Sequence, residues 1–208
     1  MASADRHPLL DGAPLSLRPD ADAPAPAGEG QPVLLLLGDC LEARAVARLA
    51  AECGFAVDMA VWEPDGALPG AADAGPDGEG AAAPDIPGLR RYIRLAPGSS
   101  PVAECAIGRR HSVCVFPPDA ATATAALEDV LASHAFYVGL WATRAGRERV
   151  WAALRAAGVP DAELAAVRCP MGLGDLGAHG GPVASAVGVL ADLLAARAGS
   201  RQRFRLED

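Results

Sequence analysis

The stretch that most constrains the fold is residues 33–55, VLLLLGDCLEARAVARLAAECGF. Val33–Leu37 is an unbroken apolar run without alternation, which is typical of a strand buried on both faces in a parallel sheet. A helix that ends at Gly54 is then expected, with an apolar face made of residues at helical spacing: Val46, Leu49, Ala50 and Cys53. A second apolar run, residues 55–62, follows at once. The stretch therefore predicts a β-α-β unit, the start of a doubly wound sheet.

Apolar strands and amphipathic helices continue to alternate along the chain. Strands are expected at residues 89–95, 111–116 and 136–141, and helices at residues 120–133, 143–157, 161–167 and 182–195. Thr143 is a good N-cap, and Pro182 suits the first turn of the last helix. The apolar face of that helix is expected to comprise Val183, Val187, Leu190 and Leu194. The predicted fold class is α/β, a Rossmann-like three-layer α/β/α sandwich with a mainly parallel sheet.

Composition divides the chain into three parts. Residues 1–31 are rich in Ala, Pro, Asp and Gly without periodicity, which predicts a disordered N-terminal segment. Residues 32–199 are predicted to form the Rossmann domain, interrupted by a flexible loop at residues 64–88 that is broken by Gly and Pro. Residues 200–208 are a polar tail.

The charge and hydropathy of the chain limit the classes of partner that it is expected to bind. A formal net charge of −8 argues against a nucleic-acid partner and against binding to an acidic membrane surface. No apolar run approaches the roughly 20 residues of a membrane span. The first residues lack the basic segment and apolar core of a signal peptide. We therefore expect a cytoplasmic protein without a membrane span.

The five cysteines show no C-x-x-C pair and no zinc-finger spacing, so we expect reduced thiols and no metal site. Cys53 and Cys114 fall in apolar patterns and are expected in the core. Cys40 and Cys169 fall at predicted turns. At the start of a helix, the helix dipole could make the Cys40 thiol more acidic, or Cys40 could be an inert turn residue.

The turn after the first strand is where a Rossmann fold binds phosphates, and here it departs from the dinucleotide fingerprint G-x-G-x-x-G/A. Its sequence is Gly38-Asp39-Cys40-Leu41-Glu42-Ala43. Cys40 replaces the middle glycine, and Glu42 adds a charge that repels a phosphate. We therefore expect NAD and FAD to bind only weakly, and a turn of this kind needs no ligand at all. Glu63 occupies the place of the acid that binds a ribose hydroxyl, or is a solvated carboxylate at a strand end.

The C-terminal part carries a series of short motifs. They are Y-V-G-L at residues 137–140, Thr143-Arg144, G-V-P at 158–160, C-P-M-G-L at 169–173 and D-L-G-A at 175–178, before the helix that begins at Pro182. In order and spacing they resemble the Rossmann domain of the XdhC/CoxI family, the accessory factors for xanthine dehydrogenase and related molybdenum hydroxylases. The family's N-terminal domain has no counterpart here. Its T-H-D-H motif looks like Pro117-Pro118-Asp119-Ala120, without the histidines.

The resemblance implies an accessory protein rather than an enzyme. Such a protein would bind molybdenum cofactor (molybdopterin), or the apo-enzyme, during cofactor insertion into a molybdenum hydroxylase of the xanthine or CO dehydrogenase type. The hydroxylase subunit is then the expected partner, and a separate chain that supplies the family's N-terminal domain is a further candidate.

Candidate cofactor-binding residues follow the predicted strands or lie in the glycine-rich loop: Gly38, Asp39, Cys40, Glu63, Asp119, Thr143, Arg144, Gly172, Asp175 and Gly177. No Ser-His-Asp, Cys-His or paired-carboxylate arrangement can be identified, so no catalytic residue is predicted. Two alternatives stay open. One is an NAD(P)- or flavin-dependent oxidoreductase, and the other is a degenerate Rossmann interaction subunit without a ligand.

Overall fold

The computed structural model describes residues 30–63, 84–172 and 176–205. The predicted disordered segment 1–31 lies outside the described residues except for its last two positions. Of the predicted flexible loop 64–88, residues 84–88 alone are described, and the tail is described as far as residue 205.

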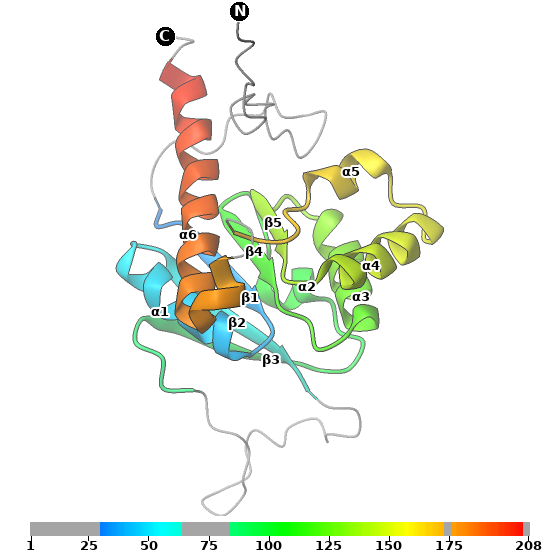
Figure 1. Cartoon of the computed structure of the whole chain (residues 1–208), viewed down its shortest axis with the longest axis horizontal. Helices are drawn as coiled ribbons and strands as arrows, with labels where there is room; N and C mark the ends of the chain where they lie inside the picture. Colours follow the sequence, from blue (N-terminus) through cyan, green and yellow to red (C-terminus); the bar gives the residue numbers. More distant parts are fainter. Residues whose placement is uncertain (1–29, 64–83, 173–175, 206–208) are drawn as a thin grey trace, which may run out of the picture.

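The domain is a five-stranded sheet with helices on both faces (Figure 1). Its strands are β1 (Val33–Leu37), β2 (Ala56–Trp62), β3 (Leu89–Leu95), β4 (His111–Val115) and β5 (Tyr137–Leu140). Its helices are α1 (Leu41–Glu52), α2 (Pro101–Cys105), α3 (Ala120–Leu131), α4 (Arg144–Ala156), α5 (Asp161–Ala166) and α6 (Leu176–Arg205). The strand order is β3-β2-β1-β4-β5, and every neighbouring pair is parallel. The predicted Rossmann-like α/β fold is confirmed.

Strand β1 lies at the centre of the sheet and supplies side chains to both layers of core. All of Val33–Leu37 is buried, as the unbroken apolar run predicted. Leu34 and Leu36 pack into the cluster under α1 and α6, while Leu35 and Leu37 pack into the cluster under α3 and α4. Each of these leucines stabilises the fold by roughly 1.5–3 kcal/mol through burial.

Helix α1 buries most of the stripe predicted from the sequence, together with Ala43, Ala45 and Ala47. Val46 and Ala50 are buried and Leu49 packs against the core, but Cys53 is exposed, so its predicted place in the core is wrong. The reason is that α1 ends at Glu52, and the chain turns away through Cys53 and Gly54, whose φ is +85°. Cys114 in β4 is fully buried, as predicted.

Helix α6 is two helical segments joined at Gly181, where the backbone leaves the helical region. The long second segment therefore begins at Pro182, as predicted. Its predicted apolar face is wrong: Val183, Val187 and Leu194 are exposed, and only Leu190 of that set is buried. The residues that pack on the core are instead Ala186, Val189, Leu190 and Leu193. Because Ala, Val and Leu occupy most of the helix surface, periodicity alone could not select the buried face.

One part of α6, Gly180–Gly199, is long and apolar enough to cross a membrane, judged by length and composition only. A single helix of this kind is weak evidence, because a helix packed on the core of a domain passes the same test. This helix contributes four side chains to the core beside α1. The absence of a membrane span stays a prediction.

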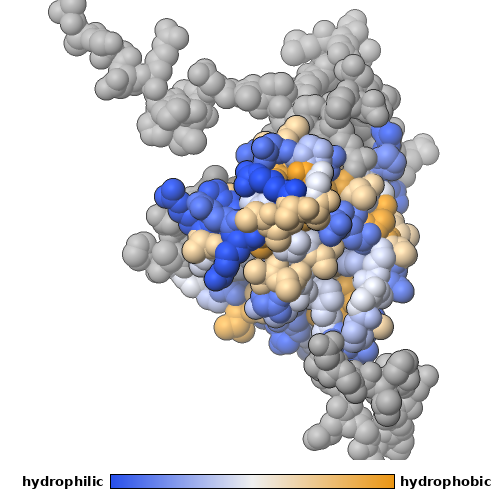
Figure 2. Space-filling view, turned by 90° about the vertical axis from the view of Figure 1, so that its right-hand side faces the viewer, coloured by the Kyte–Doolittle hydropathy of each residue, from blue (hydrophilic) through white to orange (hydrophobic). Residues whose placement is uncertain are grey.

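Many charged residues lie on the side of the molecule formed by α4 and α5. Figure 2 shows the face on the side of α4 and α5, where strongly hydrophilic residues gather. Helix α4 contributes many of the exposed charges there, among them Arg144, Glu148 and Arg149.

The edge strand β3 is held to β2 by a buried ionic cluster. Asp58 of β2 has a side-chain exposure of 0% and accepts hydrogen bonds from both Arg90 and Arg91, with shortest distances of 2.6 Å each. Burial acts to raise the pKa of Asp58, but the two guanidinium groups outweigh it, and the pKa is lowered. We call these three residues the Asp58 cluster.

The Asp58 cluster makes the free energy of unfolding depend on pH in the acidic range. Because folding lowers the pKa of Asp58, its contribution is present above the ordinary pKa of 3.8 and is lost as the pH falls below it. We expect Asp58→Asn to lower the free energy of unfolding at neutral pH by about 2–3 kcal/mol, less than for a fully buried pair because both arginines reach solvent.

Urea unfolding of the full chain at several pH values measures this. Asp85→Asn, at an exposed position near the start of β3, is the matched control and should behave as the wild type. Asp58→Asn should also lose less stability than the wild type between neutral pH and pH 3. Equal stability of the two variants at neutral pH would show that the cluster contributes nothing.

Candidate functional site

The strand order reverses between β1 and β4, because β2 and β3 are added on one side of β1 and β4 and β5 on the other. The candidate site lies at this point. Strand β1 continues into α1 on one side of the sheet, and β4 continues into α3 on the other side. All strands are parallel, so their C-terminal ends form one edge, which we call the carboxyl edge. Ligands of open α/β sheets bind at this edge, at the point where the strand order reverses.

Gly38 closes the base of that crevice. Its φ is +112°, and its amide donates to the carbonyl oxygen of Ala60 at 2.7 Å. A Cβ on Gly38 would collide with the backbone carbonyl group of Phe116, directly after β4. The glycine predicted for the tight turn is thus required by the close approach of two strand ends.

Asp39 and Cys40 in this turn form hydrogen bonds with neighbouring residues. Asp39 accepts hydrogen bonds from the Arg44 guanidinium at 2.5 and 2.8 Å and from the Tyr92 hydroxyl at 3.3 Å. The Cys40 sulfur accepts from the amide of Ala43 at 3.4 Å and so forms the N-cap of α1. That amide is among those that a phosphate would use at a helix start.

The surroundings of Cys40 disfavour a thiolate. Burial raises the pKa of the Cys40 thiol, and the hydrogen bond from Ala43, which acts in the other direction, does not compensate. This direction favours the inert turn residue over a thiolate stabilised by the helix dipole. Burial also raises the pKa of Cys169 to about 11.

The ends of β4 and β5 begin two further helices. Asp119 is the N-cap of α3 and accepts from the amide of Thr122 at 2.8 Å, a bond that lowers its pKa. Thr143 is the N-cap of α4, as predicted, and accepts from the amide of Gly146 at 3.1 Å. Arg144, the first residue of α4, has a side-chain exposure of 88% and lies 3.5 Å from Glu148.

An aromatic pair fills the space between these strand ends. The Phe116 ring is buried, and its centroid lies 6.0 Å from that of Trp141, the residue directly after β5. Neither this pair nor the hydrogen bond from Tyr92 to Asp39 could be predicted from the sequence, because each joins residues that are far apart in the chain.

The structure gathers seven of the predicted residues at the carboxyl edge. Each follows a strand end or begins the next helix: Gly38, Asp39, Cys40, Glu63, Asp119, Thr143 and Arg144. Gly172 lies elsewhere, since it packs against the backbone of Gly188 and Val189 in α6. Gly177 belongs to the short first segment of α6, and Asp175 lies outside the described residues.

The chemistry available at this edge is binding. Within the described ranges, no group of three or more His, Cys, Asp or Glu side chains is placed to hold a metal ion. Among the seven gathered residues, acids outnumber bases, and Arg144 is the one cation. A ligand with a single anionic group would suit Arg144, whereas a pyrophosphate at the β1–α1 turn would meet Asp39 and the Cys40 side chain.

Comparison with known proteins gives a family match and a structural likeness. Residues 34–193 match the family model described as the XdhC Rossmann domain. A crystal structure described as a xanthine dehydrogenase from Bacillus halodurans matches with a TM-score of 0.59 and 16% identity, over 82% of this chain and 44% of that chain. At this identity the likeness shows the shared fold, and the chain spans less than half the length of that protein. No curated protein matches.

The Gly38 contact can be tested with a matched pair of glycines. Gly38→Ala adds both a strained φ and a collision with the Phe116 carbonyl, whereas Gly54→Ala adds the strain alone, because nothing lies within 4 Å. We expect Gly54→Ala to cost about 1–2 kcal/mol and Gly38→Ala about 1–3 kcal/mol more. Denaturant unfolding measures the difference, and equal losses would show that the two strand ends can move apart freely.

The five thiols should differ in reactivity. Cys53 is exposed, whereas Cys105, Cys114 and Cys169 are shielded and have raised pKa values. We expect iodoacetamide at neutral pH to alkylate Cys53 first and Cys40 more slowly, as followed by peptide mass spectrometry. Faster alkylation of Cys40 than of Cys53 would restore the hypothesis of an activated thiol.

Proposed function

The chain belongs to the XdhC family, and from this premise we propose that it is an accessory protein for a molybdenum hydroxylase of the xanthine or CO dehydrogenase type. It acts in the cytoplasm while the hydroxylase acquires its cofactor, and it is not itself an enzyme. The observation that carries the proposal is the match of residues 34–193 to the XdhC Rossmann domain. The chemistry of the carboxyl edge agrees with a binding role.

Molybdenum cofactor carries a phosphate, and the start of α4 is the part of the edge that fits one. Arg144 extends into solvent, and its 3.5 Å contact with Glu148 is an exposed pair that contributes little energy. The dipole of α4 favours an anion there, next to the Arg144 guanidinium. When bound, the cofactor would supply the molybdenum chemistry of the hydroxylase. The residues of this chain would hold the phosphate and orient the group.

The β1–α1 turn fits the phosphate less well. It carries the carboxylates of Asp39 and Glu42, and its Arg44 guanidinium is already paired with Asp39. The same features make redox chemistry with NAD or FAD the weaker alternative. A Rossmann domain of this kind would need the bare backbone of a glycine at position 40 to admit a pyrophosphate.

The partners follow from the same premise. We propose that a hydroxylase subunit binds this chain and that a separate chain supplies the family's N-terminal domain.

A deletion strain tests the function. We expect loss of the protein to leave the hydroxylase polypeptide present at its usual level but deficient in activity and in bound molybdenum. Arg144→Glu should restore activity about tenfold less well than the wild type, because it places a negative charge where the phosphate binds. The matched control is Arg149→Glu, which makes the same change at another exposed position of α4 and should complement fully.

Immunoblotting, metal analysis and hydroxylase assay separate the outcomes. Normal hydroxylase activity in the deletion strain would refute the accessory role. Full complementation by Arg144→Glu would leave the accessory role intact but would remove α4 from the binding site.

A further inference from the structure

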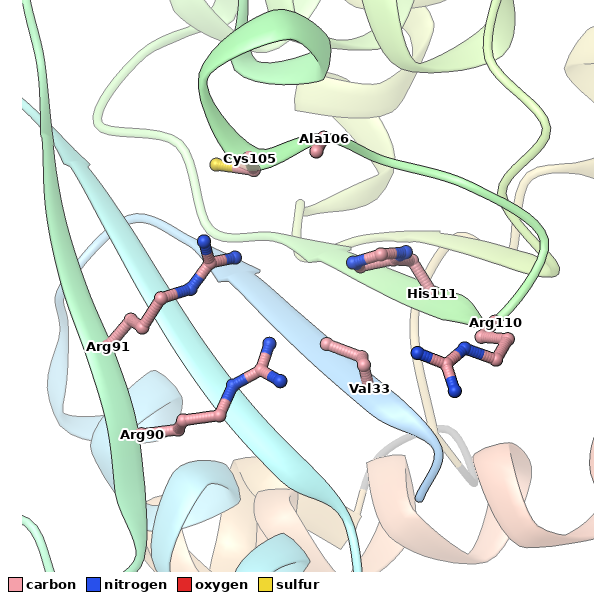
Figure 3. Close-up of a pocket in the computed structure, with 7 residues that line it drawn as sticks. All are labelled: Val33, Arg90, Arg91, Cys105, Ala106, Arg110 and His111. Atoms are coloured by element: carbon pink, nitrogen blue, oxygen red, sulfur yellow. The ribbon is translucent and has the colours of Figure 1, made fainter. Parts of the chain in front are cut away.

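A pocket of about 300 Å³ lies at the opposite edge of the sheet from the candidate site. Val33 and His111 are the first residues of β1 and β4, so this is the edge formed by the N-terminal ends of the parallel strands. Four polar side chains line the pocket: Arg90, Arg91, Arg110 and His111. Val33, Cys105 and Ala106 form the rest of its wall (Figure 3). We call it the arginine pocket.

A β-bulge brings two of the arginines to the same face. The register between β2 and β3 pairs Val57 with Leu89 but Asp58 with Arg91, so Arg90 is an extra residue in β3. In a regular strand, consecutive side chains point to opposite faces. The bulge lets Arg90 and Arg91 both reach Asp58, and Figure 3 shows their guanidinium groups extending toward the pocket. Bulges that re-aim a side chain are common next to functional sites.

The arginine pocket carries more positive charge than the fold requires. One arginine would neutralise the buried Asp58, but two bind it, and each does so through Nε and Nη2. The Nη1 groups are therefore left to donate elsewhere. Arg110 approaches from the other side of the pocket (Figure 3). Three arginines line the pocket and one carboxylate pairs with two of them, which leaves an excess of two positive charges in a chain whose net charge is −8.

The remaining wall adds a hydrogen-bond donor and an apolar surface. Nδ1 of His111 lies 3.0 Å from the amide nitrogen and 3.2 Å from the carbonyl oxygen of Gly108, so this ring nitrogen is bonded to the backbone and Nε2 is the ring nitrogen left for a ligand. Burial lowers the pKa of His111. The volume exceeds that of a phosphate ion and reaches the lower end of the range for small-molecule sites.

We infer that the arginine pocket binds a phosphate group, either as the free ion or as the terminal group of a small phosphomonoester. Guanidinium groups match phosphate oxygens in geometry and charge, and a concave site concentrates their field. The apolar wall formed by Val33, Cys105 and Ala106 would lie against the organic part of an ester. The inference does not depend on the proposed function, because the pocket and the candidate site occupy opposite edges of the sheet.

Arg110 is the residue of choice for the test, since it lines the pocket without belonging to the Asp58 cluster. Titration calorimetry of the full chain with inorganic phosphate, at constant ionic strength, should show saturable binding at one site. Arg110→Gln should weaken this binding about 10- to 100-fold, the usual effect of losing a hydrogen bond to a charged group. The matched control is Arg48→Gln, which removes one exposed positive charge from α1 and should change the affinity less than twofold.

Two further measurements locate the site and identify the ligand class. Phosphate should shift the NMR signal of the His111 ring in the wild type, with the signal identified by its loss in His111→Gln. Ribose 5-phosphate should bind more tightly than phosphate if the natural ligand is an ester, and equally if it is the free ion.

If Arg110→Gln fails to fold, Arg110→Lys keeps the charge but loses the paired donors, and it should show a smaller loss of affinity. The inference is overturned if the wild type shows no saturable binding of phosphate at millimolar concentration. It is also overturned if Arg110→Gln binds phosphate as tightly as the wild type and the Arg48→Gln control do. The third contradicting result is a His111 signal that does not move when phosphate is added.

Discussion

The close approach of β1 and β4 is the constraint on which the rest of the domain depends. Strand β1 is buried on both faces and lies between β2 and β4, so each layer of helices packs on its leucines. At its end the chain can turn into α1 only because position 38 has no Cβ against the Phe116 carbonyl. The same absence of a side chain fixes how far apart α1 and α3 begin, and therefore the shape of the crevice between them.

Much of the architecture could be predicted because it is encoded locally. The run Val33–Leu37, the Thr143 cap and the start at Pro182 each depend on a few adjacent residues. The buried face of α6 and the exposure of Cys53 could not be predicted in this way, because the first is chosen by neighbouring elements and the second by where α1 stops. The candidate site divides similarly. Its residues follow strand ends, which can be located in the sequence. Whether their polar groups are free to bind a ligand depends on partners from distant parts of the chain, such as Tyr92.

The arginine pocket shows the same limit more sharply. The strand predicted at residues 89–95 is the edge strand β3, and it carries Arg90, Arg91 and Arg94. The sequence pattern contains no sign of the bulge, because an extra residue in a ladder becomes visible only when the partner strand is known. The candidate residues at the carboxyl edge include three acids, Asp39, Glu63 and Asp119, whereas three arginines line the pocket at the opposite edge.

The bulge in β3 has a consequence for strand alignment. Edge strands with weak patterns can pair in more than one register, and apolar packing alone discriminates poorly between them. Here a slip by one position would take at least one arginine away from Asp58 and leave the buried carboxylate with less counter-charge, which costs more than a misplaced apolar contact. Deleting one residue of the bulge would restore a regular ladder but leave a single arginine opposite Asp58. The ionic cluster therefore favours the observed register of β3 over the neighbouring ones.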